Sequence, residues 1–437
     1  MASTLPSPNF DELIRVFARI GCLSFGGPAG QIALMHRELV DERKWVDEEQ
    51  YLHALNFCHL LPGPEAQQLA TWIGWKLHGI RGGLAAGLLF VFPGALIILA
   101  LSILYAYAAN LGWFASLFLG IKAAVLAIVV QALLRIGGRA LNTPFKKTVA
   151  VAAFLVLFLF NLPFPFVVLG AGALGIVVAS SRPDWLALKA STGHVAVTTK
   201  PWGASIKAVI VWCIIWAAPL ALVLATVGPD HVLWDIGLFF SQLAIVTFGG
   251  AYAVLAYMAQ EAVQGFGWLS AGEMADGLGL AETTPGPLIM VTQFVGYLAA
   301  FRAPEPFTPL VAGIIGAGLT TWVTFAPCFL WIFAFAPWIE RMENAKWLKG
   351  GLATLTAAVV GVIANLSVWF ALHVWFARVG ERQYGPLRLF WPDGSSFSWQ
   401  AALLTLMSVV LIFRCKWNVI KTLAAAGAGG LLLGQVG

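Results

Sequence analysis

The sequence predicts an all-α membrane protein that crosses the bilayer many times. Of the 437 residues, 59% are hydrophobic and 11% are charged, whereas soluble domains carry about 25% charged residues. The mean hydropathy is +0.83. Apolar runs such as 82–109 and 204–228 exceed the roughly 20 residues that a helix needs to cross the hydrocarbon core. A transmembrane barrel would show short alternating strands instead, so we expect helices.

The apolar segments form two groups on either side of a polar stretch and an isolated span. The first group lies at about 10–33, 51–77, 82–109, 113–135, 148–161 and 164–180. Residues 181–204 form the polar linker and 205–226 the isolated span. The second group lies at about 235–258, 272–301, 309–336, 350–376, 399–413 and 419–433. We therefore predict about thirteen spans in three parts: an N-terminal repeat (1–182), a linker with a connecting helix (183–234) and a C-terminal repeat (235–437).

A duplication relates the two groups. Ser24-Phe25-Gly26-Gly27 recurs as Thr247-Phe248-Gly249-Gly250, and Pro62-Gly63-Pro64 recurs as Pro285-Gly286-Pro287. Both recurrences have an offset of 223 positions, from 24 to 247 and from 62 to 285. Between residues 24 and 64 the copies align without a gap, and these pairs are identical: Phe25/Phe248, Gly26/Gly249, Gly27/Gly250, Ala33/Ala256, Met35/Met258, Glu38/Glu261, Val40/Val263, Trp45/Trp268, Leu55/Leu278, Pro62/Pro285, Gly63/Gly286 and Pro64/Pro287.

The number of spans determines how the repeats are oriented. One span between two six-span repeats gives them opposite orientations, so we expect inverted repeats. With the N-terminus in the cytoplasm, the inside loops hold sixteen Lys and Arg residues and the outside loops hold seven, as the positive-inside rule requires. The first outside loop is nevertheless highly charged, which leaves open that the Gly26-Gly27 segment is a re-entrant hairpin and that the span count differs.

The Pro-Gly-Pro triplets predict a site within the membrane. Proline removes an amide donor and excludes the preceding residue from the α region, so neither triplet fits within a regular helix. Interrupted backbone is tolerated in hydrocarbon only where protein or a water-filled cavity receives it, and amides at a helix N-terminus suit an anion. A kink that only shapes packing is the alternative. The candidate residues are Pro62, Gly63, Pro64, Thr284, Pro285, Gly286 and Pro287.

The Gly-Gly motifs have two interpretations that the sequence does not separate. Gly26-Gly27 and Gly249-Gly250 either contribute to the site or allow helices to pack closely through small residues. The hydroxyls of Ser24 and Thr247 stand next to them and suit either capping of a half-helix or donation to a ligand. Pro28 fits the start of a helix in the first copy.

Two basic residues in the apolar segments are candidates for attracting an anion, because ionisable residues in spans are functional candidates by default. Arg19 precedes the first Gly-Gly motif, and Lys122 lies well inside its span. Snorkelling to the membrane interface is the structural alternative for Lys122. Lys122 has no counterpart in the second repeat.

Three further polar residues stand near the Pro-Gly-Pro triplets. Glu65 occupies the first turn of the helix that Pro64 is expected to start, and Leu288 takes its place in the second repeat. Its carboxylate either satisfies the helix dipole or competes with an anion for the same amides, which would make it the proton-coupling group. Gln68 and Gln293 are neutral donors close to the two breaks.

Other site chemistries find no support in the sequence. The five cysteines are scattered without a CxxC pair, and the histidines have no metal-ligand spacing. There is no phosphate-binding loop, nucleophile elbow or HExxH motif, so we expect no metal, cofactor or catalysis. The net charge of +5 belongs to the loops and does not indicate nucleic-acid binding.

These motifs resemble those of the chromate ion transporters, across most of the chain and in the long two-domain form of that family. The resemblance rests on these stretches: 25–28 (FGGP), 61–70 (LPGPEAQQLA), 73–75 (IGW), 92–94 (FPG), 120–125 (GIKAAV), 281–288 (AETTPGPL) and 293–296 (QFVG). It implies export of chromate across the bacterial plasma membrane, driven by the proton gradient. Chromate is a tetrahedral dianion like sulfate, which agrees with an amide-lined site and a few basic groups.

The sequence leaves several alternatives open. An importer of sulfate or another oxyanion would carry the same features, and a passive anion channel would use the same helix breaks. The expected partners are chromate, with sulfate as an alternative, protons and the lipid bilayer, and a homodimer is left open. An intramembrane enzyme is the most distant alternative because no nucleophile and base are paired.

Overall fold

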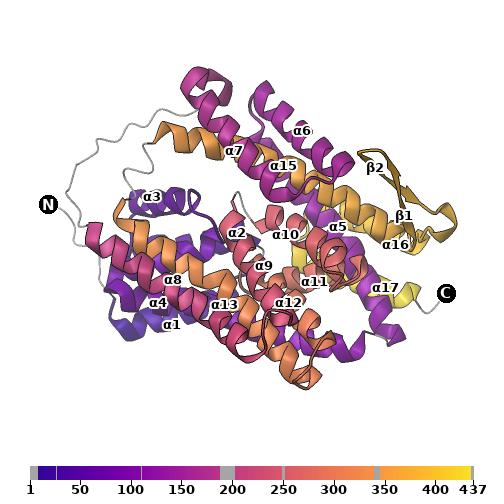
Figure 1. Cartoon of the computed structure of the whole chain (residues 1–437), viewed down its shortest axis with the longest axis horizontal. Helices are drawn as coiled ribbons and strands as arrows, with labels where there is room; N and C mark the ends of the chain where they lie inside the picture. The colour runs from indigo at the N-terminus through magenta and orange to yellow at the C-terminus, as the bar shows by residue number, and fades with distance from the viewer. Residues whose placement is uncertain are drawn as a thin grey trace. The chain divides into compact units, whose positions relative to one another are not determined.

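A computed structural model describes residues 8–25, 27–109, 111–187, 202–248, 251–338 and 345–434. These residues form helices together with one β-hairpin (Figure 1). Among them, the helices long and apolar enough to cross a membrane are α4 (Glu65–Ala108), α5 (Gly112–Ala140), α7 (Phe164–Ser181), α8 (Trp202–Thr226), α13 (Pro309–Phe335, continued to Trp338) and α15 (Lys346–Trp375). The predicted all-α membrane class is confirmed, and the count of thirteen spans stays a prediction.

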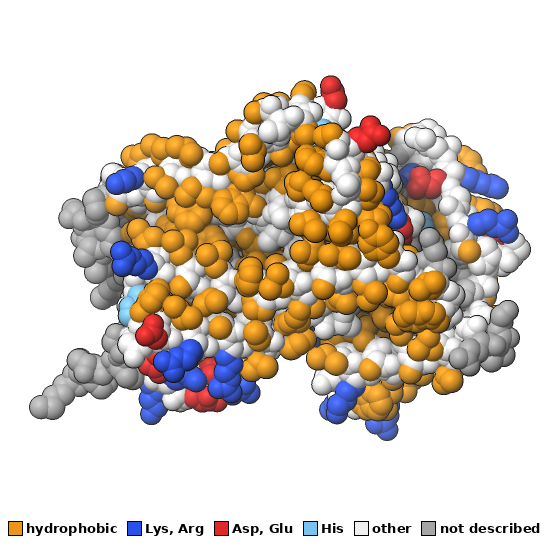
Figure 2. Space-filling model, turned by 90° about the horizontal axis from the view of Figure 1, so that it is seen from below, with side chains coloured by type: hydrophobic (Ala, Val, Ile, Leu, Met, Phe, Trp, Pro, Cys, Tyr) orange, Lys and Arg blue, Asp and Glu red, His pale blue; other side chains and the backbone are white. Residues whose placement is uncertain are grey.

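Apolar side chains reach the surface, as a lipid environment requires. In Figure 2 they cover much of the face shown, and charged side chains gather toward its edges. The clearest case is α8, in which Ser205 and Val223 are the only described residues that are buried. Many of its other apolar side chains, such as those of Ile214 and Leu222, are exposed and therefore suit contact with lipid.

The chain groups into two compact units. Unit 1 comprises 1–103, 191–251 and 284–345, and unit 2 comprises 104–190, 252–283 and 346–437. Each unit therefore combines segments from both halves of the sequence. The division into parts at 182 and 234 follows the duplication instead and stays a prediction about the repeats.

Unit 1 begins with three short helices that enclose an apolar core. They are α1 (Phe10–Leu23), α2 (Gly27–His36, extended by η1, Arg37–Glu42) and α3 (Glu48–Cys58). The Asn9 side chain caps α1 by accepting from the Glu12 amide at 2.8 Å. The buried residues of α1 follow the 3.6-residue period of a helix with one apolar face: Leu13, Val16, Phe17 and Ile20.

The longer helices of unit 1 complete this core. They are α4 to residue 103, α8, α9 (Val232–Val246), α12 (Val291–Arg302, preceded by η4, Leu288–Met290) and α13. Helix α8 packs along α13 (Figure 1). Helices α12 and α13 meet through glycines, because a Cβ on Gly296 would lie 3.1 Å from the Gly316 carbonyl oxygen.

Unit 2 is arranged around α5 and α15. The other elements are α6 (Pro144–Phe160), α7, η2 (Pro183–Leu186), α10 (Ala251–Gln260), η3 (Glu261–Gly265), α11 (Ala271–Thr283), β1 (Val379–Tyr384), β2 (Leu387–Pro392), η6 (Gly394–Ser396), α16 (Trp399–Val409), η7 (Val410–Arg414) and α17 (Val419–Leu433). The backbones of α5 and α17 touch, since a Cβ on Gly120 would clash with the Ala426 carbonyl.

Two features of the fold are absent from the sequence-based prediction. The helices predicted at 51–77 and 82–109 do not end in a loop between them, because α4 runs through residues 65–108 with a kink at His78 and Gly79, where Gly79 has φ +62°. The stretch 379–392 forms an antiparallel hairpin in register Tyr384↔Leu387. Each strand has only six residues in which apolar and polar side chains could alternate, which is a weak signal beside 20-residue apolar runs.

Candidate functional site

Both Pro-Gly-Pro triplets lie in unit 1, and each interrupts a helical stretch. In the first, the chain leaves α3 at Cys58 and α4 begins at Glu65, directly after Pro64. In the second, α11 ends at Thr283 and the chain resumes as a 3₁₀ turn at Leu288. The central glycines have φ +116° (Gly63) and +98° (Gly286), a region that L-residues with a side chain rarely adopt. Only glycine fits the middle of either triplet.

The two triplets are each hydrogen-bonded to the Gly-Gly motif of the opposite repeat. The Gly63 amide donates to the Thr247 carbonyl at 2.8 Å, and the Gly286 amide donates to the Ser24 carbonyl at 2.9 Å. Adding 223 to 24 and 63 gives 247 and 286, so one bond is the repeat image of the other. The four motifs that the sequence singled out are therefore brought together by this reciprocal pair of backbone bonds, all within unit 1.

The polar groups of these motifs already have partners. The amides of Gly63 and Gly286 are used in the reciprocal pair. The Ser24 hydroxyl donates to the Ile20 carbonyl at 2.6 Å, and the Thr247 hydroxyl donates to the Leu243 carbonyl at 2.5 Å. Each hydroxyl thus satisfies the carbonyl one turn back in its own helix, which is a common role for such residues at a helix end.

The predicted glutamines support the backbone on both sides. The Gln68 side-chain amide donates to the Pro62 carbonyl at 2.7 Å, across the first triplet. The Gln293 amide donates to the Ala95 carbonyl at 2.9 Å and its oxygen accepts from the Thr321 hydroxyl at 3.0 Å. Gly94 is in direct contact with the second triplet, because a Cβ there would lie 2.5 Å from the Pro285 carbonyl oxygen.

Two buried glutamines near the breaks were missed by the sequence analysis. The Gln31 amide donates to the Gly286 carbonyl at 2.5 Å and Gln67 lies in the first turn of α4. The side-chain oxygens of Gln31, Gln67 and Gln68 are buried without a hydrogen-bond partner among the described residues. Polar residues this close to a break in an apolar segment were the available signal. If the side-chain amide of one of these glutamines rotates by half a turn, its NH₂ group takes the place of the unpartnered oxygen and becomes a donor there.

Glu65 and Thr284 are buried beside the triplets. Glu65 is the first residue of α4 and is 8% exposed, and its carboxylate is near the thiols of Cys58 and Cys328. A carboxylate in this position is favoured by the positive end of the helix dipole. Thr284 is 5% exposed and directly precedes the second triplet.

Gly27 begins α2 with φ +69°, and no atom that the described residues place outside its own helix turn lies within 4 Å of where its Cβ would be. The open space speaks against close helix packing as its role, whereas the positive φ accounts for the glycine. The predicted residues Gly26, Gly249 and Gly250 lie outside the described residues.

Arg19 lies on the exposed side of α1. Its side chain is 57% exposed, and its guanidinium is 3.6 Å from a carboxylate oxygen of Glu38. Glu38 is 1% exposed and also pairs with Arg43. This places Arg19 in a charge cluster with the η1 segment rather than against the triplets.

Lys122 belongs to unit 2, where it pairs with a residue that the sequence analysis did not select. Its ammonium is 3.2 Å from an oxygen of Asp276 on α11. The same oxygen accepts from the Tyr105 hydroxyl at 2.6 Å. Asp276 lies in the segment 272–301 that was predicted as a span, so its charge was a usable signal that the sequence analysis did not use.

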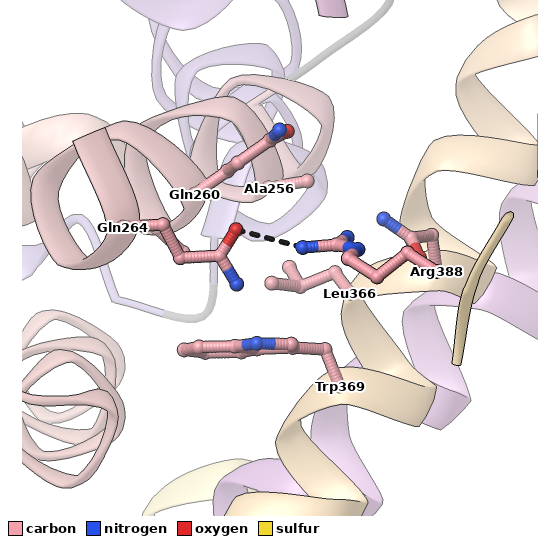
Figure 3. Close-up of a pocket in the computed structure, with 8 residues that line it drawn as sticks. Ala256, Gln260, Gln264, Leu366, Trp369 and Arg388 are labelled. Atoms are coloured by element: carbon pink, nitrogen blue, oxygen red, sulfur yellow. Dashed lines mark hydrogen bonds between the residues drawn. The ribbon is translucent and has the colours of Figure 1, made fainter. Parts of the chain in front are cut away.

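Unit 2 also contains a small polar cavity, which lies between α10, α15 and β2 (Figure 3). Arg388 reaches over it and donates to the Gln264 oxygen at 3.0 Å, while the Trp369 ring lies flat along one side. Its volume is about 20 Å³, which is room for about one water molecule. The cavity is therefore too small for a tetrahedral oxyanion. Among the described residues, no group of three His, Cys, Asp or Glu side chains could hold a metal ion.

Comparison with known proteins identifies the family. The model of the family described as chromate transporter matches residues 12–176 and 234–431. A chromate transport protein of Pseudomonas aeruginosa is 31% identical over 439 residues, with 98% of this chain and 93% of that protein covered. A chromate transport protein of Cupriavidus metallidurans is 28% identical, with 99% and 94% covered. A probable chromate transport protein of Synechococcus elongatus is 29% identical, with 83% and 85% covered. No solved structure matches the chain.

The matched ranges agree with the duplication. They begin at residues 12 and 234, a separation of 222 positions (234 − 12), and the motifs recur at an offset of 223. Each repeat therefore matches the family by itself, and the relatives align over nearly the full length. The chain belongs to the chromate transporter family.

Proposed function

We propose that this protein exports chromate across the bacterial plasma membrane as a secondary transporter driven by the proton gradient, and so confers chromate resistance. Family membership supports chromate as the transported ion. The reciprocal pairing of the helix breaks in unit 1 carries the mechanistic part of the proposal. Broken helices at matching places in two inverted repeats are how many secondary transporters form their binding sites.

The oxyanion binds at the breaks in this proposal. Because the amides of Gly63 and Gly286 are already bonded, the free donors there are the first amides of α4, from Glu65 to Gln67, which have no intrahelical acceptor. The Gln67 and Gln68 side chains add NH₂ groups after rotation of their amides. Arg19 in unit 1 and Lys122 in unit 2 each supply positive charge that attracts the dianion to its own unit, and movement of one bundle against the other provides alternating access.

Glu65 is the proposed proton-coupling group of unit 1. As a carboxylate it competes with the oxyanion for the α4 amides, and as a carboxylic acid it leaves them to the anion. Glu65→Gln, which is permanently neutral, should keep chromate binding and lose at least about tenfold of the proton-driven rate, on the scale of one acid–base group. The measurement is chromate uptake into proteoliposomes with and without a pH gradient. Equal stimulation by the gradient in Glu65→Gln and the wild type would exclude Glu65.

Uptake of chromate into inverted membrane vesicles tests the function as a whole. Energised vesicles with the protein should accumulate chromate, and an uncoupler should abolish the accumulation. Vesicles from cells that lack the protein are the control. Accumulation that survives the uncoupler would contradict proton-driven export, and equilibration without accumulation would favour a channel.

Competition by excess sulfate measures the selectivity, and stronger accumulation of sulfate than of chromate would favour a sulfate transporter. The homodimer stays a prediction for measurement in detergent or nanodiscs.

A further inference from the structure

Unit 2 contains a buried carboxylate that the proposed site in unit 1 does not use. Asp276 on α11 is 4% exposed. One of its oxygens, Oδ2, accepts from the Tyr105 hydroxyl at 2.6 Å and lies 3.2 Å from the Lys122 ammonium. Its other oxygen, Oδ1, is buried and has no hydrogen-bond partner among the described residues. Helices α4, α5 and α11 thus each contribute one residue to a polar cluster inside an apolar unit.

The unpartnered oxygen distinguishes this cluster from a purely structural ion pair. A buried charge is stable only when it is paired and its remaining lone pairs are hydrogen-bonded. Asp276 meets the first condition through Lys122, but Oδ1 does not meet the second. A proton on Oδ1 removes the negative charge, and a neutral carboxyl tolerates such an environment far better. The geometry therefore provides a place for a proton to bind.

Lys122 provides the positive charge that an anion can use when Asp276 is neutral. Its ammonium carries three donors, and its side chain is 24% exposed, so one side remains accessible to a ligand. Gly272 lies close to the ammonium, since a Cβ there would lie 3.2 Å from Nζ, a tight contact that the flexible lysine side chain can relieve by a small shift. When Asp276 is charged, its carboxylate forms an ion pair with the Lys122 ammonium. When Asp276 is neutral, the positive charge is free for an anion.

Among the other charged groups, Glu273 acts electrostatically on Asp276, and its negative charge favours the neutral carboxyl. Glu273, one turn before Asp276 on α11, accepts from the amide and hydroxyl of Ser270 and so caps its own helix. Helices α15 and α17 also pack on α11. Their titratable residues stand at the helix ends: Lys346, Lys349 and His373 on α15 and Lys421 on α17.

We infer that Asp276, Lys122 and Tyr105 form a proton-linked oxyanion site, in which protonation of Asp276 frees Lys122 to bind the tetrahedral dianion. The inference rests on the proposed function and adds its direction of linkage: a proton and the oxyanion occupy the site together. A dianion with one proton still carries a net negative charge. The inside-negative membrane potential therefore favours its outward movement, whereas the pH gradient opposes the exit of the bound proton, so the electrical part of the proton gradient drives export in this inference.

The test is binding of radiolabelled chromate to the purified full-length protein in nanodiscs between pH 6 and pH 8.5. Chromate itself takes up a proton in this range, so the informative quantity is the difference between the wild type and Asp276→Asn. Linkage to one proton steepens the fall in affinity with rising pH by up to about tenfold per pH unit. Asp276→Asn should lose this extra slope and bind more tightly than the wild type at pH 8.5, and the pH dependence that remains should come from the titration of chromate and of Glu65.

Tyr105→Phe is the second variant, and it keeps the carboxyl. Loss of the hydroxyl donor to Oδ2 disfavours the charged form of Asp276, so the pH dependence should shift toward higher pH without loss of maximal binding. A merely structural role for Tyr105 would lower binding at every pH instead. Identical pH dependence in the wild type and both variants would overturn the inference, as would loss of binding by a folded Asp276→Asn at all pH values. Absence of chromate binding by the wild type would instead refute the proposed function, and the inference with it.

Discussion

The two units use different chemistry at their polar centres. In unit 1 the centre is built from backbone, and it is symmetric: the bond from Gly63 to Thr247 has its repeat image in the bond from Gly286 to Ser24. In unit 2 the centre is built from side chains, and it is asymmetric. Lys122 and Asp276 come from different repeats. The carboxylate is not duplicated, since the position of the first repeat that corresponds to Asp276 is occupied by His53 (276 − 223).

This difference has a physical basis. Backbone amides and carbonyls are present at every position, so a duplicated segment keeps its backbone bonds in both copies whenever the glycine and proline that shape them are kept. A buried charge needs a partner of opposite sign, and a duplicated pair would place four such charges in an apolar interior. A symmetric frame with a single charged pair avoids that cost. We therefore expect substitutions of the glycines and hydroxyl residues at the unit 1 breaks to act mainly on structure, whereas substitutions of Glu65 and of the charged pair in unit 2 should act on ion binding and coupling.

The largest expected effect is in unit 2. Lys122→Ala should reduce chromate transport at least about 100-fold and destabilise the protein by about 3–5 kcal/mol, because Asp276 is left as an unpaired buried charge. The double variant Lys122→Ala with Asp276→Asn should recover stability but not transport. Proteoliposome transport and thermal unfolding measure the two effects.

Exposed basic residues provide the controls for this prediction. Lys147→Ala removes an exposed lysine of α6 and should leave both quantities unchanged. Arg19→Ala, the variant of the basic candidate in unit 1, should lower transport less than Lys122→Ala, because Arg19 is more than half exposed and paired with Glu38. Full transport by Lys122→Ala would remove the charge-based role of unit 2.

The second effect tests the symmetric frame of unit 1. Gly63→Ala and Gly286→Ala should each destabilise the protein by about 1–3 kcal/mol, because a side chain is forced into a positive φ. Gly63→Ala should cost more, since its Cβ would lie 2.9 Å from both the Cys328 sulfur and the Gln68 amide, whereas the Cβ at Gly286 would lie 3.2 Å from Gly94. Thermal unfolding in detergent ranks the two.

Gly79→Ala is the matched control, because Gly79 has φ +62° and no atom within 4 Å of its Cβ position. It carries the conformational penalty without a contact, so it should be the mildest of the three and keep transport. Equal destabilisation by all three variants would show that the contacts at the breaks contribute nothing.

The sequence predicts much of unit 1 because its determinants are local. Pro62 and Pro64 exclude a continuous helix wherever the chain folds, and the 223-residue offset assigns the same break to the second repeat. The pairing of Gly63 with Thr247 is not local, since it joins segments 184 residues apart (247 − 63), and no pattern within either motif specifies it. The same holds for Asp276, whose role depends on Lys122 and Tyr105 from two other helices.

A smaller effect separates backbone from side chain at the unit 1 breaks. Ser24→Ala and Thr247→Val remove hydroxyls that bond within their own helices, whereas the bonds between repeats use the backbone carbonyls. Each variant should therefore lose only about 0.5–1.5 kcal/mol, the value of one hydrogen bond, and keep transport within about threefold of the wild type, a change of ~0.7 kcal/mol in barrier. Loss of transport with unchanged stability would mean that the hydroxyls contact the ion directly.

The smallest effect concerns the charges of unit 1 outside its apolar helices. Burial lowers the pKa of His36, but the hydrogen bond and charge of Glu48 and the charge of Asp41 outweigh burial and raise it above its ordinary value of 6.5. A raised pKa in the folded state stabilises the protein below the ordinary pKa, and this contribution is lost as the pH rises through the folded-state value. His36→Gln should therefore lower stability by up to about 1 kcal/mol at pH 5.5, the upper end for exposed ion pairs, and change little at pH 8.5. His59→Gln, at an exposed histidine, is the control, and unfolding temperatures at the two pH values give the measurement.

Because these charges surround a loop rather than the helix breaks, chromate transport by His36→Gln should follow the wild type at both pH values. A pH-dependent loss of transport in this variant would show that the charges around His36 take part in coupling beside Glu65.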